Sequence, residues 1–169
     1  MSVETMEDLF QDTLKDIYYA EKQILKALPG MIKKAQSPEL AEALETHRGE
    51  TEGQIERLEE VFSLIDAAAR GKKCDAIEGI LKEAKEHMSE IEDKLVRDAG
   101  MIGSAQAVEH YEITRYGTLI AWAKTLGEQD KIVSLLQQNL DEEKNADKLL
   151  SQIAKTVVNE HAKQAKMAA

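Results

Sequence analysis

Apolar residues recur along most of the chain at the spacing of an amphipathic helix. Leucine, isoleucine, valine and phenylalanine repeat at intervals of three, four and seven positions, which places them on one helical face. Four of the segments with this pattern are long and one is short. The pattern predicts helices over residues 5–35, 38–69, 75–87, 92–126 and 130–159.

Local signals mark several ends of these helices. Ser37 followed by Pro38 is typical of a helix start, because the serine side chain caps the first turn and proline fits its first position. Gly127 follows the third long segment and is a natural C-terminal cap. The Pro29-Gly30 pair interrupts the first segment, so we expect a kink or an early end there.

The connections between the predicted helices indicate their arrangement. Short turns join the first two and the last two long helices, whereas roughly 25 residues separate the two hairpins, more than the 2–8 usual between antiparallel neighbours. A long second connection of this kind occurs in ferritin-like bundles. We therefore predict an all-α, ferritin-like antiparallel four-helix bundle with a short extra helix in the crossover between the second and third long helices. It forms a single domain over residues 1–160, followed by a frayed tail over residues 161–169.

Each long helix carries a carboxylate on its apolar face, where a leucine would be expected. These residues are Glu21, Glu50, Glu112 and Glu143. Each lies about 13–15 residues from the turn of its hairpin, roughly 20–22 Å along the helix axis. Four acids at one height repel one another, and a buried bare charge costs several kcal/mol. A bound cation relieves both effects, and four-helix bundles hold pairs of metal ions in this way.

Further polar residues share these inward faces. His47 lies one turn before Glu50 and is the one histidine of the four that falls on an inward face. Because helical phase drifts over a long helix, Glu109 and Asp147 fall at the margins of the same stripe. The predicted metal ligands are Glu21, His47, Glu50, Glu109, Glu112, Glu143 and Asp147.

The ligand types indicate which metal such a site prefers. Hard oxygen ligands with a single imidazole suit iron or manganese better than zinc or copper, so we predict one or two Fe or Mn ions. Side chains expected beside the ligands are Tyr18, Tyr116 and Gln54. A metal-free alternative stays open, in which the acids are protonated or bridged by water in a non-catalytic dimeric scaffold. Iron storage, a third possibility, needs a large shell of subunits that nothing in the sequence specifies.

Composition narrows the classes of partner and compartment. The formal net charge is −10, whereas nucleic-acid binding requires a basic face. No apolar run approaches the roughly 20 residues of a membrane span, and MSVETMEDLF lacks the features of a signal peptide. Cys74 is the single cysteine, which excludes an internal disulfide and a thiolate metal cluster. These features predict a cytoplasmic protein without nucleic-acid or membrane partners.

Four segments resemble the YciF-type bacterial stress proteins. They are TMEDLFQDTLKDIYYAEKQILKALPGM, HRGETEGQIERLEEVF, QAVEHYEITRYGTLIAWAKTLG and LDEEKNADKLL. The resemblance covers roughly residues 4–158. It implies a ferritin-like bundle with a crossover helix, a homodimer, a cytoplasmic location and induction under stress. By analogy with rubrerythrin it also implies a carboxylate metal site made of the ligands named above.

The chain departs from the usual ligand motif of ferritin-like proteins, which is Glu-x-x-His. Gly53 stands at the histidine position after Glu50. Ala146 takes the same position after Glu143. The inward histidine, His47, instead precedes Glu50 by three residues. The resemblance therefore predicts a metal site that handles peroxide or oxygen during stress, with His47 on one ion, and leaves the number of ions open.

Overall fold

The computed structural model describes residues 3–165, and within that range every regular element is a helix. The elements are α1 (Met6–Lys34), α2 (Pro38–Leu64), α3 (Asp75–Glu90), α4 (Lys94–Leu126), α5 (Asp130–Ile153), a π-helical segment η1 (Ala154–Val158) and α6 (Asn159–Ala165). The all-α prediction is confirmed. None of the helices in the described range is long and apolar enough to cross a membrane.

Side-chain caps fix where several helices begin and end. The Ser37 side chain accepts a hydrogen bond from the backbone N–H of Leu40, and Pro38 occupies the first turn of α2, as predicted. Asp93 caps α4 in the same way. Gly127 ends α4 with a φ of 72°, a left-handed conformation that glycine adopts without steric cost.

Two helix ends differ clearly from the prediction, and the early end considered at Pro29 does not occur. Pro29 lies inside α1, which continues to Lys34 instead of ending early. Helix α2 stops at Leu64 because Asp66 takes a positive φ of 51° and the Ala67 N–H bonds back to the Phe62 carbonyl at 2.9 Å. The chain also stays helical through α6, so the first five residues of the predicted frayed tail are ordered in a helix; residues 166–169 lie outside the described range.

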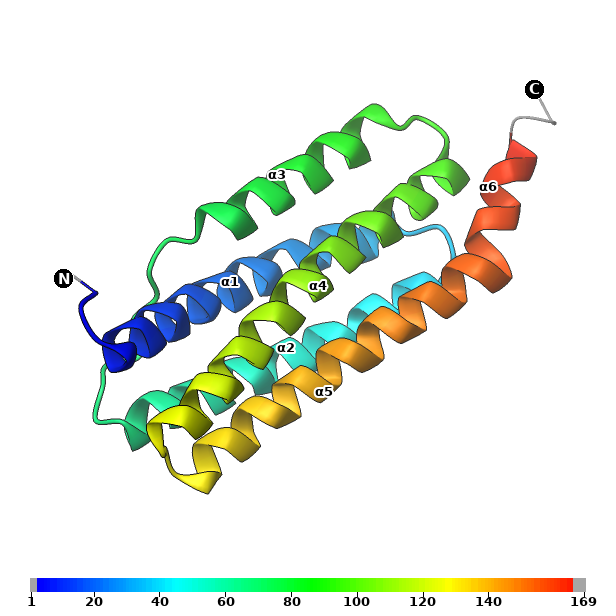
Figure 1. Ribbon diagram of the computed structural model, residues 1–169. Helices are drawn as coiled ribbons and strands as arrows, with labels where there is room; N and C mark the ends of the chain where they lie inside the picture. The colour runs from blue at the N-terminus through cyan, green and yellow to red at the C-terminus, as the bar shows by residue number, and fades with distance from the viewer. Residues whose placement is uncertain (1–2, 166–169) are drawn as a thin grey trace.

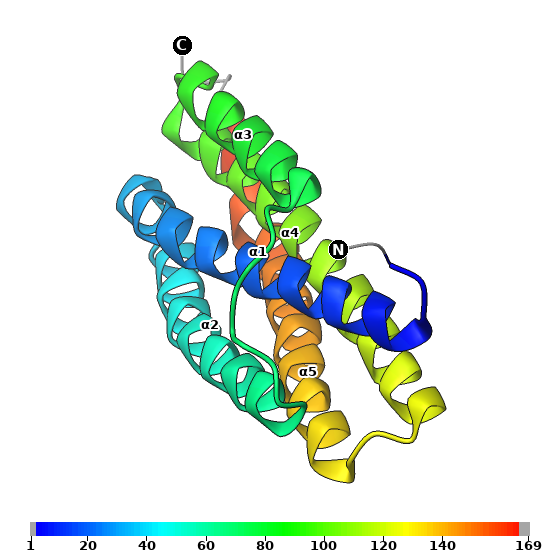
Figure 2. The ribbon, with the colours of Figure 1, turned by 90° about the vertical axis from the view of Figure 1, so that its left-hand side faces the viewer.

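The four long helices pack as a closed ring. Helix α1 packs against α2 and α4, and α5 packs against the same two helices (Figure 1). The segment of residues 65–74 passes along the outside of the bundle from the end of α2 to the start of α3 (Figure 2). Helix α3 lies outside the ring against α4 and α1. This crossover brings the second hairpin alongside the first.

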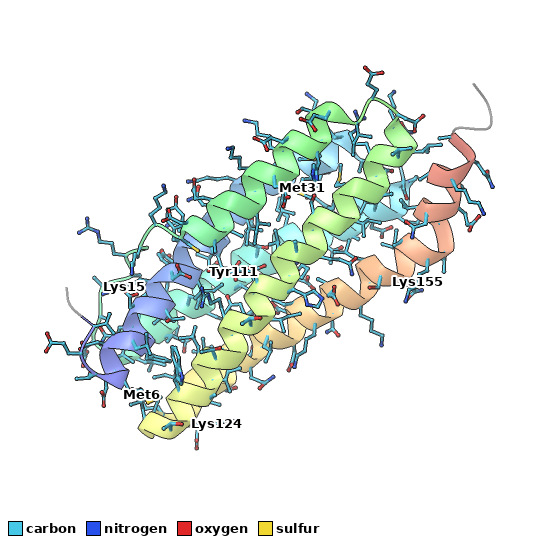
Figure 3. The ribbon with its side chains drawn as sticks, turned by 45° about the horizontal axis from the view of Figure 1, so that its top comes forward. Met6, Lys15, Met31, Tyr111, Lys124 and Lys155 are labelled. Atoms are coloured by element: carbon cyan, nitrogen blue, oxygen red, sulfur yellow. The ribbon has the colours of Figure 1, made fainter. Side chains whose placement is uncertain are left out.

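Apolar layers fill the ring on both sides of a polar layer at mid-length. Fully buried side chains of one apolar layer include Leu14, Leu58, Leu119 and Leu136, and those of the other include Leu28, Leu44, Met101 and Leu150. Tyr111, which adjoins Glu112 in sequence, lies about midway between the labelled ends of the bundle in Figure 3. The polar layer therefore lies near the centre of the molecule, far from either end.

Candidate metal centre

Four buried carboxylates meet in the polar layer. Helix α1 supplies Glu21, α4 supplies Glu109 and Glu112, and α5 supplies Glu143. Each is at most 2% exposed. Glu109 and Glu112 are one turn apart and therefore share the inward face of α4. Each residue lies near the middle of its helix, which puts all four at one height in the bundle.

Helix α2 contributes an imidazole to this layer in place of the expected carboxylate. His47 is buried, with 7% of its side chain exposed, whereas 33% of the Glu50 side chain is exposed. The inward face of α2 runs through His47, Thr51 and Gln54, so Glu50 lies at its edge. Glu50 is therefore less buried than the apolar stripe predicted, although its Oε2 lies 3.5 Å from Nδ1 of His47. Its place among the metal ligands stays a prediction.

Asp147 also lies outside the cluster. Its side chain is 23% exposed and lies 3.3 Å from Nε2 of His110, a histidine on the outer side of α4. Gln106 Nε2 donates a second contact to Asp147 at 2.8 Å. These contacts tie α4 to α5 at the rim of the bundle and leave Asp147 apart from the four buried acids.

The buried side chains converge closely enough to share one cation. One ligand atom from each of His47, Glu109, Glu112 and Glu143 lies within 4.8 Å of the other three. Nε2 of His47 is 3.5 Å from Glu109 Oε1 and 3.9 Å from Glu143 Oε2. Metal–ligand bonds of about 2.0–2.6 Å allow a single ion to touch atoms up to about 5 Å apart. The spacing therefore fits an ion at the centre of these atoms.

Many polar atoms of this cluster have no hydrogen-bond partner. Within the described residues, the buried atoms without one include Glu21 Oε2, Glu109 Oε2, both oxygens of Glu112, Glu143 Oε2 and both ring nitrogens of His47. An unpaired buried polar atom costs about 1–3 kcal/mol, and more when it is charged. Native interiors leave few such atoms, so a concentration of them in one layer indicates a ligand that satisfies them.

The buried acids strongly favour their protonated forms. Burial raises the pKa of Glu21 to about 8, and the negative charge of Glu143 adds to the rise. Burial also raises the pKa of Glu109 to about 7 and raises the pKa values of Glu112 and Glu143 well above 4.5. Burial lowers the pKa of His47, but the surrounding carboxylates outweigh that effect and raise it. The layer therefore holds protons, or another cation, near neutral pH.

A hydrogen-bonded frame holds two of the acids in place. The Tyr116 hydroxyl donates to Glu21 and accepts from Asn139 Nδ2 at 3.0 Å. The side-chain Nε2 of Gln54 donates to Glu143 Oε1, and the backbone carbonyl of Gln54 accepts from Asn139 Nδ2 at 3.3 Å. Each acid thus has one oxygen fixed by the frame and the other free of hydrogen bonds. Tyr116 and Gln54 lie beside the ligands, as predicted.

The frame continues to a residue that the sequence pattern did not single out. Arg57 Nε donates to Asn139 Oδ1, and its Nη2 bonds to Glu142. Arg57 lies one turn after Gln54, a spacing that could have suggested a shared role. The Tyr18 hydroxyl, in contrast, donates to Glu59 at 2.6 Å, and its hydrogen-bond partners do not include the ligands. Its predicted place beside the ligands stays a prediction.

The donor set decides which cations the cluster suits. Carboxylate oxygens with one imidazole nitrogen are the ligands that iron and manganese prefer, and the described residues bring no thiolate into this layer. A divalent ion would let the acids ionise and would satisfy the oxygens that lack partners. The residues present therefore fit one such ion, and Glu21, with its free Oε2, is placed to contact a second.

Comparisons with known proteins give the family and its relatives. Residues 5–163 match the family model described as "Domain of unknown function (DUF892)". The chain is 42% identical to Protein YciF of Escherichia coli (strain K12) over 163 residues, which are 96% of this chain and 98% of that protein. The crystal structure of the E. coli stress protein YciF matches with a TM-score of 0.88 at 41% identity, covering 93% of this chain and 99% of that one.

Two other solved structures match over most of their length. YcfI of Rhodopseudomonas palustris, described as a candidate structural protein, has a TM-score of 0.89 at 53% identity and covers 90% of this chain and 97% of its own. A Xanthomonas campestris protein at 22% identity has a TM-score of 0.73, covers 95% and 97%, and shows the shared fold alone. Because the family model and the E. coli relative both match nearly the whole chain, this chain belongs to the YciF-like family described as DUF892.

Proposed function

We propose that this protein is a ferritin-like stress protein whose mid-bundle carboxylates bind iron or manganese and act on peroxide or oxygen. The observation that carries the proposal is the meeting of His47 with four buried glutamates whose facing oxygens lack hydrogen-bond partners. The ring of four long helices and the long crossover through α3 support the ferritin-like assignment. The E. coli relative is a stress protein, which supports the link to stress.

The side chains divide into roles by position. His47, Glu109, Glu112 and Glu143 would hold the first ion, and Glu21 would share a second with Glu112. A bound iron or manganese ion supplies Lewis acidity and one-electron redox chemistry. Tyr116 and Gln54 orient one oxygen of Glu21 and Glu143, respectively. Burial keeps bulk water away from the reacting atoms.

A second candidate function is a metal-free structural bundle. The Rhodopseudomonas relative is described as a candidate structural protein. Within the cluster, Glu21 with Glu112 and Glu109 with Glu143 can pair as acids that share a proton. In that case the polar layer fixes helix register and no turnover occurs.

Elemental analysis separates the two candidates. Protein purified without chelator, then dialysed against Fe²⁺ or Mn²⁺ under anaerobic conditions, should retain one or two ions per chain. Glu112→Gln should lose most of that metal, because both Glu112 oxygens face the cluster without a partner. Glu52→Gln, on the exposed side of α2, is the matched control and should keep it. Metal-free wild-type protein would favour the structural candidate.

The quaternary state and compartment predicted from the sequence extend the proposal. We propose a homodimer in the cytoplasm, with no nucleic-acid partner. Size-exclusion chromatography with light scattering should give twice the chain mass of 18.9 kDa, or about 38 kDa. A mass many times larger would instead favour the storage shell that the sequence left as a third possibility.

A further inference from the structure

A cavity of about 80 Å³ leads from the surface to the candidate metal centre between α2 and α5. Its inner end is lined by His47 and Glu109, which are 5% and 2% exposed. Its outer end is lined by the exposed residues Thr46, Asn145 and Leu149. The cavity therefore joins solvent to two residues of the cluster with atoms that lack hydrogen-bond partners, namely both ring nitrogens of His47 and Oε2 of Glu109.

The walls of this cavity restrict what can pass. They are mostly apolar, and the small side chains of Ala43 and Ala146 leave its space open. A water needs at least about 10–15 Å³ of such volume, so the cavity holds a few water-sized molecules. Dioxygen and hydrogen peroxide are of that size. An organic hydroperoxide with a branched alkyl group is too bulky.

A second cavity approaches the same two residues from the opposite side of the bundle. It measures about 20 Å³ and also contacts His47 and Glu109. Helix α3 covers it through Leu81 and Ala84, and Ala105 of α4 lines it. It has room for about one water and lies beneath a helix, so it offers a poor route to the centre.

We infer that the cavity between α2 and α5 is the substrate entrance of the centre, and that the substrate class is dioxygen or hydrogen peroxide and excludes branched organic hydroperoxides. This inference rests on the proposed metal-binding function. If His47 and the buried glutamates held two ferrous ions, these would supply two electrons in all and become ferric. Reduction of one hydrogen peroxide would then break its O–O bond, take up two protons and give two waters, whereas reduction of one dioxygen would take up two protons and give one hydrogen peroxide.

Two substitutions block or widen the entrance without removing a ligand. Ala146→Leu fills the cavity from α5, and Ala105→Leu is its matched control because it places the same side chain in the α3-side cavity. Leu149→Ala widens the mouth; Leu149 is 41% exposed, so this variant folds even if an overpacked one does not. Iron content is measured for each variant before its reaction is followed by stopped-flow absorbance.

The expected result is specific to the entrance. At equal iron content, Ala146→Leu slows oxidation by hydrogen peroxide at least tenfold and Ala105→Leu changes it less than twofold. Wild-type protein reacts with tert-butyl hydroperoxide at least a hundredfold more slowly than with hydrogen peroxide. In Leu149→Ala the difference between the two rates is smaller, because the wider mouth admits the bulkier peroxide. A crystal of metal-free protein under xenon pressure shows xenon between α2 and α5, an independent readout of access.

Other results overturn the inference. Equal rates for Ala146→Leu and wild type, or equal wild-type rates with the two peroxides, exclude this entrance while leaving the metal site intact. If Ala146→Leu does not fold, Leu149→Ala provides the test instead. The entrance is then also excluded if the ratio of the oxidation rates with hydrogen peroxide and tert-butyl hydroperoxide is the same in Leu149→Ala as in wild type. The absence of xenon between α2 and α5 in the pressurised crystal also counts against this entrance. If wild-type protein retains neither iron nor manganese after dialysis against them, the proposed function and this inference are overturned together.

Discussion

The surroundings of Glu112 are unfavourable for a negative charge unless the residue is protonated or bound to a cation. It is 1% exposed, and neither of its oxygens has a hydrogen-bond partner. The charges of Glu143, Glu21 and Glu109 raise its pKa further, beyond the effect of burial. A glutamate kept for packing alone would have its oxygens paired, so its position indicates a role in holding positive charge.

Glu112→Gln should therefore stabilise the chelated protein. Glutamine removes an acid that must otherwise stay protonated among other acids, and its shape is nearly the same. We expect the Tm of the chelated variant at pH 8 to exceed that of wild type by roughly 2–6 °C. Circular dichroism melts provide the measurement. A lower Tm would show that the carboxyl group makes stabilising contacts that the amide cannot replace.

Tyr116→Phe should destabilise the protein whether or not metal is present. The hydroxyl is buried, donates to Glu21 and accepts from Asn139, so its loss leaves two buried polar groups without partners. The expected loss is about 1–3 kcal/mol in urea unfolding. Tyr18→Phe is the control: its hydroxyl bonds to the more accessible Glu59 and Lys22, so its removal should cost about 0.5–1.5 kcal/mol. Equal losses would contradict the buried frame.

For single residues, the sequence predicted which types of side chain form the site better than it predicted which individual residues belong to it. Glu21, Glu112 and Glu143 interrupt otherwise apolar stripes, and all three are buried as expected. Glu109, predicted at the margin of its stripe, is buried, whereas Glu50, predicted on the apolar face, lies at the edge of that face. A small rotation of the helix decides which side chain enters the core, and tertiary packing sets that rotation.

The role of backbone conformation in ending a helix can be tested separately from the candidate metal centre, by comparing two glycines. Gly127 has a φ of 72° and nothing near its would-be Cβ, whereas Gly30 lies inside α1 with equal free space. Gly127→Ala should cost about 1 kcal/mol because alanine resists the left-handed conformation. Gly30→Ala should instead stabilise by about 0.5–1 kcal/mol.

Denaturant unfolding of these two alanine variants compares backbone conformation directly. Both substitutions add the same methyl group without a steric clash, so opposite signs can come only from the backbone. If both variants changed stability in the same direction, the assignment of Gly127 as a left-handed cap would be wrong.

At the scale of elements, the predicted helices agree with the structure where caps and breaks are strong. Ser37 and Gly127 mark their boundaries correctly. Pro29 does not end α1, since packing of the buried Leu28 and Met31 against the core outweighs the cost of one proline. The continuation of the helix beyond residue 159, through α6, was missed because α6 packs on α4, a contact distant in sequence.

For the whole molecule, the buried acids predict how stability changes with pH. In the folded protein the pKa of Glu21 is about 8 and that of Glu109 about 7, compared with 4.5 in the unfolded chain. The folded state therefore binds more protons between these values. The free energy of unfolding of chelated protein should fall as pH rises from about 5 to 8, and deprotonation of His47 adds to the fall.

Bound metal should remove most of this slope, because the acids are then ionised and paired with the ion. Urea unfolding at pH 5, 6, 7 and 8, with and without Mn²⁺, checks both statements. Stability of the chelated protein that rises with pH across this range would mean that the acids are ionised and paired within the protein.

The arrangement of the whole molecule followed from two features of the sequence. The long segment between the predicted helices that end at residue 69 and begin at residue 92 predicted that the hairpins are related by a crossover, and the structure places α3 there. The equal depth of the acids along their helices predicted a single polar layer. The cavity between α2 and α5 could not be predicted, because it arises from the small residues Ala43 and Ala146, which lie on different helices and more than 100 positions apart in the chain.

The most direct measurement of the central idea is anomalous diffraction from crystals grown with Fe²⁺ or Mn²⁺, recorded at the absorption edge of that metal. We predict a peak within bonding distance of His47, Glu109, Glu112 and Glu143. Ordered waters or paired carboxyl groups at that position, with no anomalous signal in protein soaked at millimolar metal, would contradict it.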